Sequence, residues 1–196
     1  MVIDIGTGDG LYVYQSARRY PEKFYIGVDA SARPLEKISE KIYRKQSKGG
    51  RPNALFVQAA IEDLPLELNG IAGELHVHFP WGSLLRIVAE GDLASLQSLR
   101  RVCSPGGMLT VIIGLDPDRD RAEVLRLGLA PFSIAYIDST LTPRYKKGGF
   151  EVVKRGMLPP AEWTKLETSW ASRLKGDGNR SVFYILARAV ESEGDA

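Results

Sequence analysis

Apolar residues occur in short runs separated by polar turns through the first half of the chain. The runs that have the length and continuity of buried strands are 1–5, 24–28, 54–58, 74–79 and 108–113. Segments with apolar side chains at helical spacing lie between them, at 11–20, 34–46 and 93–102, and the Pro-Gly-Gly at 105–107 predicts a turn. This alternation predicts a parallel sheet with helices on both faces.

The second half is less regular. Helices are predicted at 119–127, 131–141 and 160–174, and strands at 150–155 and 181–190. We expect one domain spanning residues 1–196, with helical insertions around 115–141 and 159–175.

A glycine-rich turn joins the first predicted strand to the first helix, with the spacing Gly6-x-Gly8-x-Gly10. Such a turn brings a ligand close to the backbone, but a dinucleotide site needs Gly-x-Gly-x-x-Gly to hold a pyrophosphate. The carboxylates of this turn would repel a phosphate and suit the ammonium and sulfonium groups of S-adenosylmethionine. The residues that we expect to hold this cofactor here are Asp4, Gly6, Thr7, Gly8 and Asp9.

Two later strand ends add polar groups to the predicted site. Asp29 ends the second strand, where an acidic side chain can accept hydrogen bonds from both ribose hydroxyls. Ala60 and Glu62 follow the third strand, where a polar side chain can face the adenine amino group. Together these strand ends predict a methyltransferase that uses S-adenosylmethionine. These acidic residues also have structural explanations: Asp9 and Asp63 could cap helices, and Asp29 could be a surface carboxylate.

The end of the fourth strand carries the candidate acceptor site. Pro80 is a rigid residue beside the large aromatic Trp81, and together they can form a platform for a flat acceptor. His76 and His78 lie on one face of this strand, and because no third ligand accompanies them we expect no metal site.

The string from 79 to 85, Phe-Pro-Trp-Gly-Ser-Leu-Leu, is uncommon. It resembles the aminoglycoside-resistance 16S rRNA methyltransferases of the kanamycin and apramycin type, which act on N1 of an adenine in the ribosomal decoding site. The resemblance covers nearly the whole chain and includes the strings at 4–10, 25–29, 47–50, around Glu62 and at 168–174. The sequence departs from the family pattern in beginning at the first strand, where members carry a β-hairpin-like segment ahead of it. It also lacks an aromatic and a basic residue common in the loop at 175–180.

The resemblance implies a role for individual side chains. Asp29 and Glu62 would hold the ribose and adenine of the cofactor. Trp81 and Trp170 would sandwich the target adenine after it is flipped out of the RNA, and Thr168 would position Trp170. Without the resemblance, the spacing of Trp170 on the predicted helix 160–174 favours a core position.

The net charge of the chain is only +2, but the charges are segregated. Residues 33–51 include seven basic and two acidic side chains, and residues 144–180 include nine basic and four acidic ones. Segregated positive charge suits a phosphate backbone, although solvated helix faces and loops would give the same pattern. The residues that the resemblance implies for RNA binding are Lys41, Arg44, Lys45, Lys48, Arg51, Arg173 and Arg180, the last gripping a phosphate near the flipped nucleotide.

The predicted fold is therefore α/β, that of a class I, Rossmann-like methyltransferase. As this methyltransferase class implies, its seven-stranded sheet should have the order 3-2-1-4-5-7-6, with strand 7 antiparallel. The chain has one cysteine, Cys103, which we expect to be a buried thiol in a helix. That count, together with the absence of an apparent signal peptide or membrane segment, favours a reducing, cytoplasmic setting without membrane contact.

The predicted function is methylation of adenine N1 in the decoding site of the 30S subunit, which confers aminoglycoside resistance. We expect a monomer that converts S-adenosylmethionine to S-adenosylhomocysteine. Adenine N1 has a free lone pair, so in-line placement suffices and no general base is required. The alternatives are a tRNA methyltransferase that forms 7-methylguanosine and a non-catalytic RNA-binding protein of the same fold.

Overall fold

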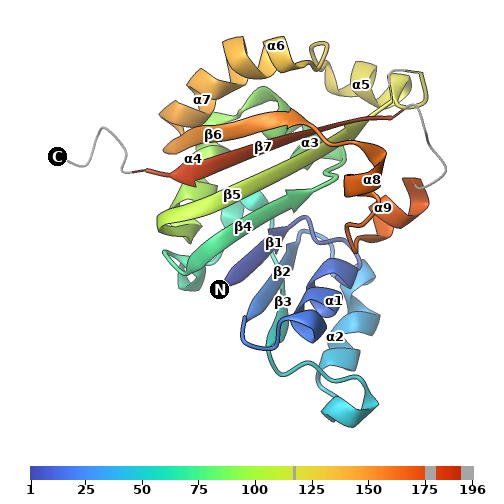
Figure 1. The fold of residues 1–196 in the computed structure, drawn as a ribbon. Coiled ribbons are helices and arrows are strands. Elements are labelled where there is room, and N and C mark those ends of the chain that lie inside the picture. Colours follow the sequence, from blue (N-terminus) through green and yellow to red (C-terminus); the bar gives the residue numbers. More distant parts are fainter. Residues whose placement is uncertain (117, 175–179, 191–196) are drawn as a thin grey trace.

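The computed structural model describes residues 1–116, 118–174 and 180–190. Within these residues, seven strands form one sheet in the order β3-β2-β1-β4-β5-β7-β6 (Figure 1). The strands β1 to β5 pair in parallel, and β7 runs antiparallel to both β5 and β6. The predicted sheet order and the antiparallel seventh strand are confirmed.

The strands are β1 (Val2–Ile5), β2 (Tyr25–Asp29), β3 (Ala54–Gln58), β4 (Ala72–His78), β5 (Cys103–Leu115), β6 (Phe150–Met157) and β7 (Ser181–Ala189). The helices of the first half are α1 (Leu11–Arg19), α2 (Glu36–Ile42), α3 (Gly82–Glu90) and α4 (Leu93–Val102). Those of the second half are α5 (Arg121–Leu127), α6 (Ile134–Tyr136), α7 (Thr142–Lys147), α8 (Pro160–Trp163) and α9 (Ser169–Leu174). A π-helical segment, Ile137–Leu141, joins α6 to α7.

Helices cover both faces of the sheet, and the central strands are therefore buried on both sides. On one face, a large apolar core joins the strands to α3, α4 and α7. On the other face, α1 and α2 pack on β1 to β3, while α8 and α9 pack on β5 and β7. Side chains alternate between the faces, so Asp4 points to the same side as α1, whereas Ile3 and Ile5 enter the large core. The α1 and α9 helices therefore meet beside the carboxyl ends of the parallel strands (Figure 1).

Helix α3 was not predicted. It begins at Gly82 directly after Trp81, and no side chain caps its N-terminus, so the usual sequence signal for a helix start is missing. Its buried residues Leu85, Ile87 and Val88 enter the large core.

Several predicted boundaries were wrong. The segment 105–107 is not a turn between elements, because β5 already begins at Cys103, which is buried in a strand rather than in a helix. Ala72 pairs with Cys103 and Glu74 pairs with Met108, so the Pro-Gly-Gly forms an irregularity within the ladder.

Three predicted helices also differ. The segment 34–46 is α-helical only over Glu36–Ile42. The segment 131–141 starts at Ile134 and continues to Lys147. The segment 160–174 is two short helices, which puts Trp163 and Trp170 in different environments. The loop at 175–180, where the sequence departs from the family pattern, lies outside the described residues except for Arg180. In the described part of the chain, none of the helices combines the length and apolarity of a membrane span.

Candidate cofactor and base-binding site

The glycine turn after β1 has three glycines with positive φ, at 72° for Gly6, 60° for Gly8 and 72° for Gly10. A Cβ atom on Gly6 would lie 2.3 Å from Leu84, and one on Gly10 would lie 2.5 Å from the Phe56 ring. By contrast, nothing lies within 4 Å of a Cβ atom placed on Gly8. Gly6 and Gly10 therefore serve the packing of the protein, whereas Gly8 leaves open space where a ligand can approach the backbone.

A cleft follows this turn in two halves that share Gly6, Gly8 and Trp170. The first half encloses about 260 Å³ and its walls include Asp4, Thr7, Asp9, His78 and Arg173. The second half encloses about 280 Å³ and its walls include Asp29, Ala60, Glu62, Pro80 and Trp81. The structure thus brings all the residues predicted to bind the cofactor to one cleft.

Asp29 is held in place before any ligand arrives. Its Oδ2 accepts a hydrogen bond of 2.8 Å from the Gly8 backbone N–H, and its Oδ1 accepts one of 2.9 Å from the Ser31 N–H. A carboxylate has about four acceptor positions, so these two bonds leave room for ribose hydroxyls. Glu62 lies across this half of the cleft on a short helical turn and is exposed.

Asp4 lies at the bottom of the first half and is 3% exposed. Burial raises the pKa of its carboxyl to about 6, an effect that the Thr7 hydroxyl and His76 reduce. Its Oδ1 has no hydrogen-bond partner among the described residues. A buried acceptor without a partner is costly, and an ammonium group would satisfy it.

The donors and acceptors of the cleft fit S-adenosylmethionine. Asp4 offers a carboxylate to an ammonium group, Asp29 offers acceptors to ribose hydroxyls, and the open space at Gly8 admits a ligand between them. These residues would hold the methionine end in the first half and the adenosine end in the second half.

Trp81 and Trp170 stand face to face at the cleft. Their ring centroids are 5.7 Å apart with 22° between the ring planes, and the residues are 40% and 37% exposed. Phe79, which is buried, has a positive φ of 48° and turns the chain at the end of β4 so that Pro80 and Trp81 follow at the cleft wall. A non-glycine residue in this region costs about 1–3 kcal/mol and is held by its surroundings.

On the opposite side, Thr168 fixes the start of the helix that carries Trp170. Its Oγ1 accepts a hydrogen bond of 2.9 Å from the Ala171 N–H, as an N-cap side chain does. Ala171 is fully buried against the sheet, whereas Trp170 points to the cleft. Trp163, seven positions earlier, is 2% exposed and packs edge to face with Phe79, as expected for a structural residue.

The basic residues of the α2 region fall into two groups. Arg44, Lys45 and Lys48 are exposed. Lys41 and Arg51 instead lie over the Tyr14 ring, with Nζ at 4.2 Å and Cζ at 4.7 Å from its centroid. These cation–π contacts orient the segment that carries the exposed charges.

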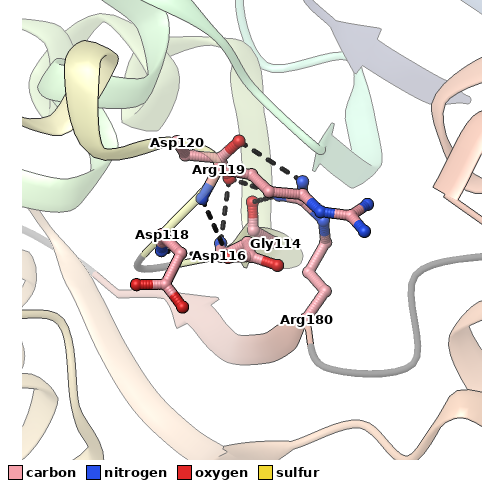
Figure 2. A network of polar contacts seen from close by, with 6 residues as sticks. All are labelled: Gly114, Asp116, Asp118, Arg119, Asp120 and Arg180. Carbon is pink, nitrogen blue, oxygen red and sulfur yellow. Dashed lines mark hydrogen bonds and ion pairs between the residues drawn. The ribbon is translucent and has the colours of Figure 1, made fainter.

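Arg180, predicted to grip a phosphate, is buried in a polar network at the end of β5 (Figure 2). Its side chain is 6% exposed and forms an ion pair with Asp120, which is 9% exposed. It also donates a hydrogen bond of 3.1 Å to the Gly114 carbonyl. Asp120 accepts a further hydrogen bond of 2.9 Å from the Asp116 N–H. In this arrangement the guanidinium faces Asp120 rather than solvent, which does not favour the predicted phosphate contact.

The sequence presents His78 only as a candidate metal ligand, yet in the structure it lines the first half of the cleft. Its position could have been found from the parallel pairing of β1 and β4, which places Asp4 beside His76. His78 is the next side chain on the same face of β4 and therefore lies one step closer to the cleft. Ser169, which also lines this half, donates a 2.5 Å hydrogen bond to Asp9 Oδ2. Nothing in the sequence signals that contact across 160 positions.

This sheet order, with a glycine turn after β1 and carboxylates at the ends of β1 and β2, defines the class of Rossmann-like methyltransferases that use S-adenosylmethionine. Residues 1–189 match the family model described as NpmA: 16S rRNA (adenine(1408)-N(1))-methyltransferase. The chain therefore belongs to this family.

Individual relatives agree with this assignment. The 16S rRNA (adenine(1408)-N(1))-methyltransferase of Streptoalloteichus tenebrarius is 40% identical over 188 residues, which are 95% of this chain and 85% of that protein. The crystal structure of the aminoglycoside resistance methyltransferase NpmB1 is 46% identical, with a TM-score of 0.84 over 96% of this chain and 86% of that one. A mutant of the Catenulisporales acidiphilia 16S rRNA (adenine(1408)-N(1))-methyltransferase, solved with its cosubstrate SAM, is 33% identical, with a TM-score of 0.89 over 100% of this chain and 88% of that one.

Proposed function

We propose that this protein methylates N1 of the 16S rRNA adenine that its relatives' names number 1408, within the 30S subunit, and so confers aminoglycoside resistance. The observation that carries the proposal is the pair of exposed tryptophans, Trp81 and Trp170, stacked at the mouth of the cleft. Two such rings can hold a flipped base by its two faces, and each stacked base contributes about 1–3 kcal/mol. That contribution offsets the few kcal/mol needed to unstack the base.

The spacing of the rings indicates how the base would be admitted. Stacked aromatic carbons lie about 3.5 Å apart, so a base between two rings needs about 7 Å between their planes. The centroids of Trp81 and Trp170 are 5.7 Å apart, so the rings must separate by about 1 Å or more to admit it. In the free protein the two rings cover each other's inner faces instead.

The cleft residues would orient the reactants without a catalytic base. When bound, S-adenosylmethionine supplies an electrophilic methyl group, and its product is S-adenosylhomocysteine. Asp4 and Asp29 would hold the two ends of the cofactor, while Trp81 and Trp170 would hold the base beside it. Adenine N1 is unprotonated at neutral pH, so positioning within about 3–3.5 Å is the main requirement.

Contacts to the rRNA backbone would come first from the exposed Arg44, Lys45 and Lys48. Arg173 is exposed and lies 5.8 Å from the Trp170 centroid, where it could meet a phosphate beside the flipped base. Lys41 and Arg51 would act mainly through Tyr14, which they flank. Arg180 would reach a phosphate only if its ion pair with Asp120 opened.

The test is reverse transcription across the decoding site of purified 30S subunits treated with the protein and S-adenosylmethionine. A methyl group on N1 blocks the pairing edge of adenine, so we expect a stop at that position. Trp81→Ala and Trp170→Ala should abolish the stop while calorimetry still detects S-adenosylhomocysteine binding. Tyr20→Ala is the matched control, because Tyr20 is an aromatic residue of similar exposure, 46%, outside the cleft.

Two results would contradict the proposal. Read-through at the adenine with wild-type protein that binds S-adenosylhomocysteine would exclude this substrate, and transfer to bulk tRNA instead would favour the 7-methylguanosine alternative. Unchanged transfer by both tryptophan variants would exclude the stacking role. Expression in a susceptible bacterium, followed by kanamycin and apramycin challenge, then checks the resistance phenotype.

A further inference from the structure

A pair of buried polar side chains lies beneath the first half of the cleft. Asp4 is the last but one residue of β1 and His78 ends the neighbouring parallel strand β4, and the side chain of each is 5% exposed. Asp4 Oδ1 and His78 Nδ1 both lack a hydrogen-bond partner among the described residues. Both side chains also line the cleft. Buried polar atoms are usually paired, so these two atoms indicate a missing partner on the cleft side.

The distance between the two atoms defines what that partner is. Asp4 Oδ1 and His78 Nδ1 are 3.6 Å apart, which is too long for a direct hydrogen bond. A single nitrogen about 2.8 Å from each atom fits between them. The partner must therefore donate at least two hydrogen bonds from one atom.

The charge of the pair identifies the chemistry. Burial lowers the pKa of His78 well below its ordinary value, and His76 lowers it further, so the imidazole is neutral and can accept through an unprotonated nitrogen. Asp4 is largely a carboxylate at neutral pH, since its pKa is about 6. Other polar groups near the pair are Thr7, Tyr12, Asp29, His76 and Arg173. Two acceptors with one negative charge match an ammonium group, which has three donors and a positive charge.

We infer that His78 is a cofactor-binding residue whose imidazole Nδ1 accepts a hydrogen bond from the α-ammonium group of S-adenosylmethionine, while Asp4 binds the same group by charge. The inference rests on the proposed placement of the methionine end in the first half of the cleft. If it is correct, His78 discriminates ligands that carry an amino group from those that lack one. Fixing the ammonium at two points also fixes the direction in which the methionine chain leaves the pocket.

The test is calorimetric binding at neutral pH of three ligands: S-adenosylhomocysteine, its deaminated analogue that keeps the carboxylate, and 5′-methylthioadenosine, which lacks both groups. His78→Leu removes the acceptor. A hydrogen bond to a charged group contributes enough that its loss weakens S-adenosylhomocysteine binding about 10- to 100-fold. Binding of the other two ligands should change less than about twofold, because neither has an ammonium to lose. His78→Asn, which can place an amide oxygen near the position of Nδ1, should restore most of the affinity.

His76→Leu is the matched control. It makes the same substitution two positions earlier on the same face of β4, at a residue that does not line the cleft, and should leave S-adenosylhomocysteine affinity within about threefold. Thermal unfolding identifies any variant that fails to fold. Should His78→Leu not fold, His78→Ala removes the same acceptor, and its loss of affinity for S-adenosylhomocysteine but not for the deaminated analogue still tests the contact.

Other outcomes overturn the inference. Equal weakening of the deaminated analogue by His78→Leu would mean that His78 serves the carboxylate or the shape of the pocket. Unchanged S-adenosylhomocysteine affinity would mean that His78 makes no contact. If wild-type protein binds S-adenosylhomocysteine but leaves 30S subunits unmodified, the proposed substrate fails while the inference about His78 stands.

Discussion

Removing the Asp120 carboxylate should destabilise the protein more than removing its partner, Arg180. The two side chains are 9% and 6% exposed, and they pair through two nitrogen–oxygen contacts (Figure 2). Breaking a buried pair by deleting one partner costs about 3–5 kcal/mol, because the other charge stays buried. Asp120 also accepts the hydrogen bond from the Asp116 N–H, which adds about 1 kcal/mol when it is lost.

We therefore expect Asp120→Ala to lose about 4–5 kcal/mol and Arg180→Met about 3 kcal/mol. The double variant leaves no buried charge from this pair and should lose only about 2 kcal/mol, less than either single change. For a chain of this length each kcal/mol lowers Tm by about 2–4 °C, so the Asp120→Ala shift is about 10 °C or more. Urea unfolding of all four proteins gives the coupling energy directly.

The control is Glu151→Ala, which breaks the ion pair between Glu151 and Arg188 on β6 and β7, where both side chains are more than half exposed. Its cost should be at most about 1 kcal/mol. The reasoning is refuted if Arg180→Met leaves stability unchanged while weakening 30S binding. That result would mean that Arg180 serves the phosphate contact implied by the family resemblance and not the network at the end of β5.

Further predictions concern the cleft. Gly8→Ala should cost only about 1–2 kcal/mol in unfolding free energy for its positive φ, yet strongly weaken S-adenosylhomocysteine binding by calorimetry, because the cleft is open where its Cβ atom would point. Cofactor affinity should fall about tenfold per pH unit below the Asp4 pKa of about 6. The reason is that the ammonium group pairs with the ionised Asp4 carboxylate, so a protonated Asp4 must lose its proton before the cofactor binds. A flat profile of binding against pH from 7 to 5 would contradict this. Thr168→Val removes the bond to the Ala171 N–H, costs about 1 kcal/mol, and should reduce methyl transfer more than cofactor binding; equal losses would argue against a role in orienting Trp170.

The first half of the fold could be predicted because its signals are local. Continuous apolar runs locate β1 to β4. The acidic residues Asp4, Asp29 and Glu62, at or shortly after the ends of β1 to β3, locate the cleft, since parallel strands bring their carboxyl ends together. Helix α3 gives a weaker signal: its start has no capping side chain, and only the apolar spacing of residues 84–88 indicates it.

Contacts between distant parts of the chain could not be predicted. One continuous helix over 160–174 would place Trp163 and Trp170 on the same stripe and bury both. The chain instead breaks between them, and the break contains neither proline nor glycine to announce it. Thr168 is the one local signal, as a capping residue three positions before Ala171. The pairing of Asp120 with Arg180 spans 60 positions and follows only from the meeting of two loops at the end of β5 and the start of β7.

If Trp81 and Trp170 hold the base as proposed, the way each of them is anchored determines which part must move to admit it. On one side, Phe79 is buried at the end of β4 and fixes the backbone that leads to Trp81. On the other, α9 is held by the buried Ala171 and by the hydrogen bond from Ser169 to Asp9. Because both backbones are fixed while both rings are more than one third exposed, rotation of the side chains is the smaller rearrangement. The rings would then exchange their one mutual stacking contact for two contacts with the base, so insertion would gain about one stacking contact rather than two. The cost of breaking that pair would belong to substrate binding and would leave the proposed cofactor contacts of Asp4 and Asp29 untouched.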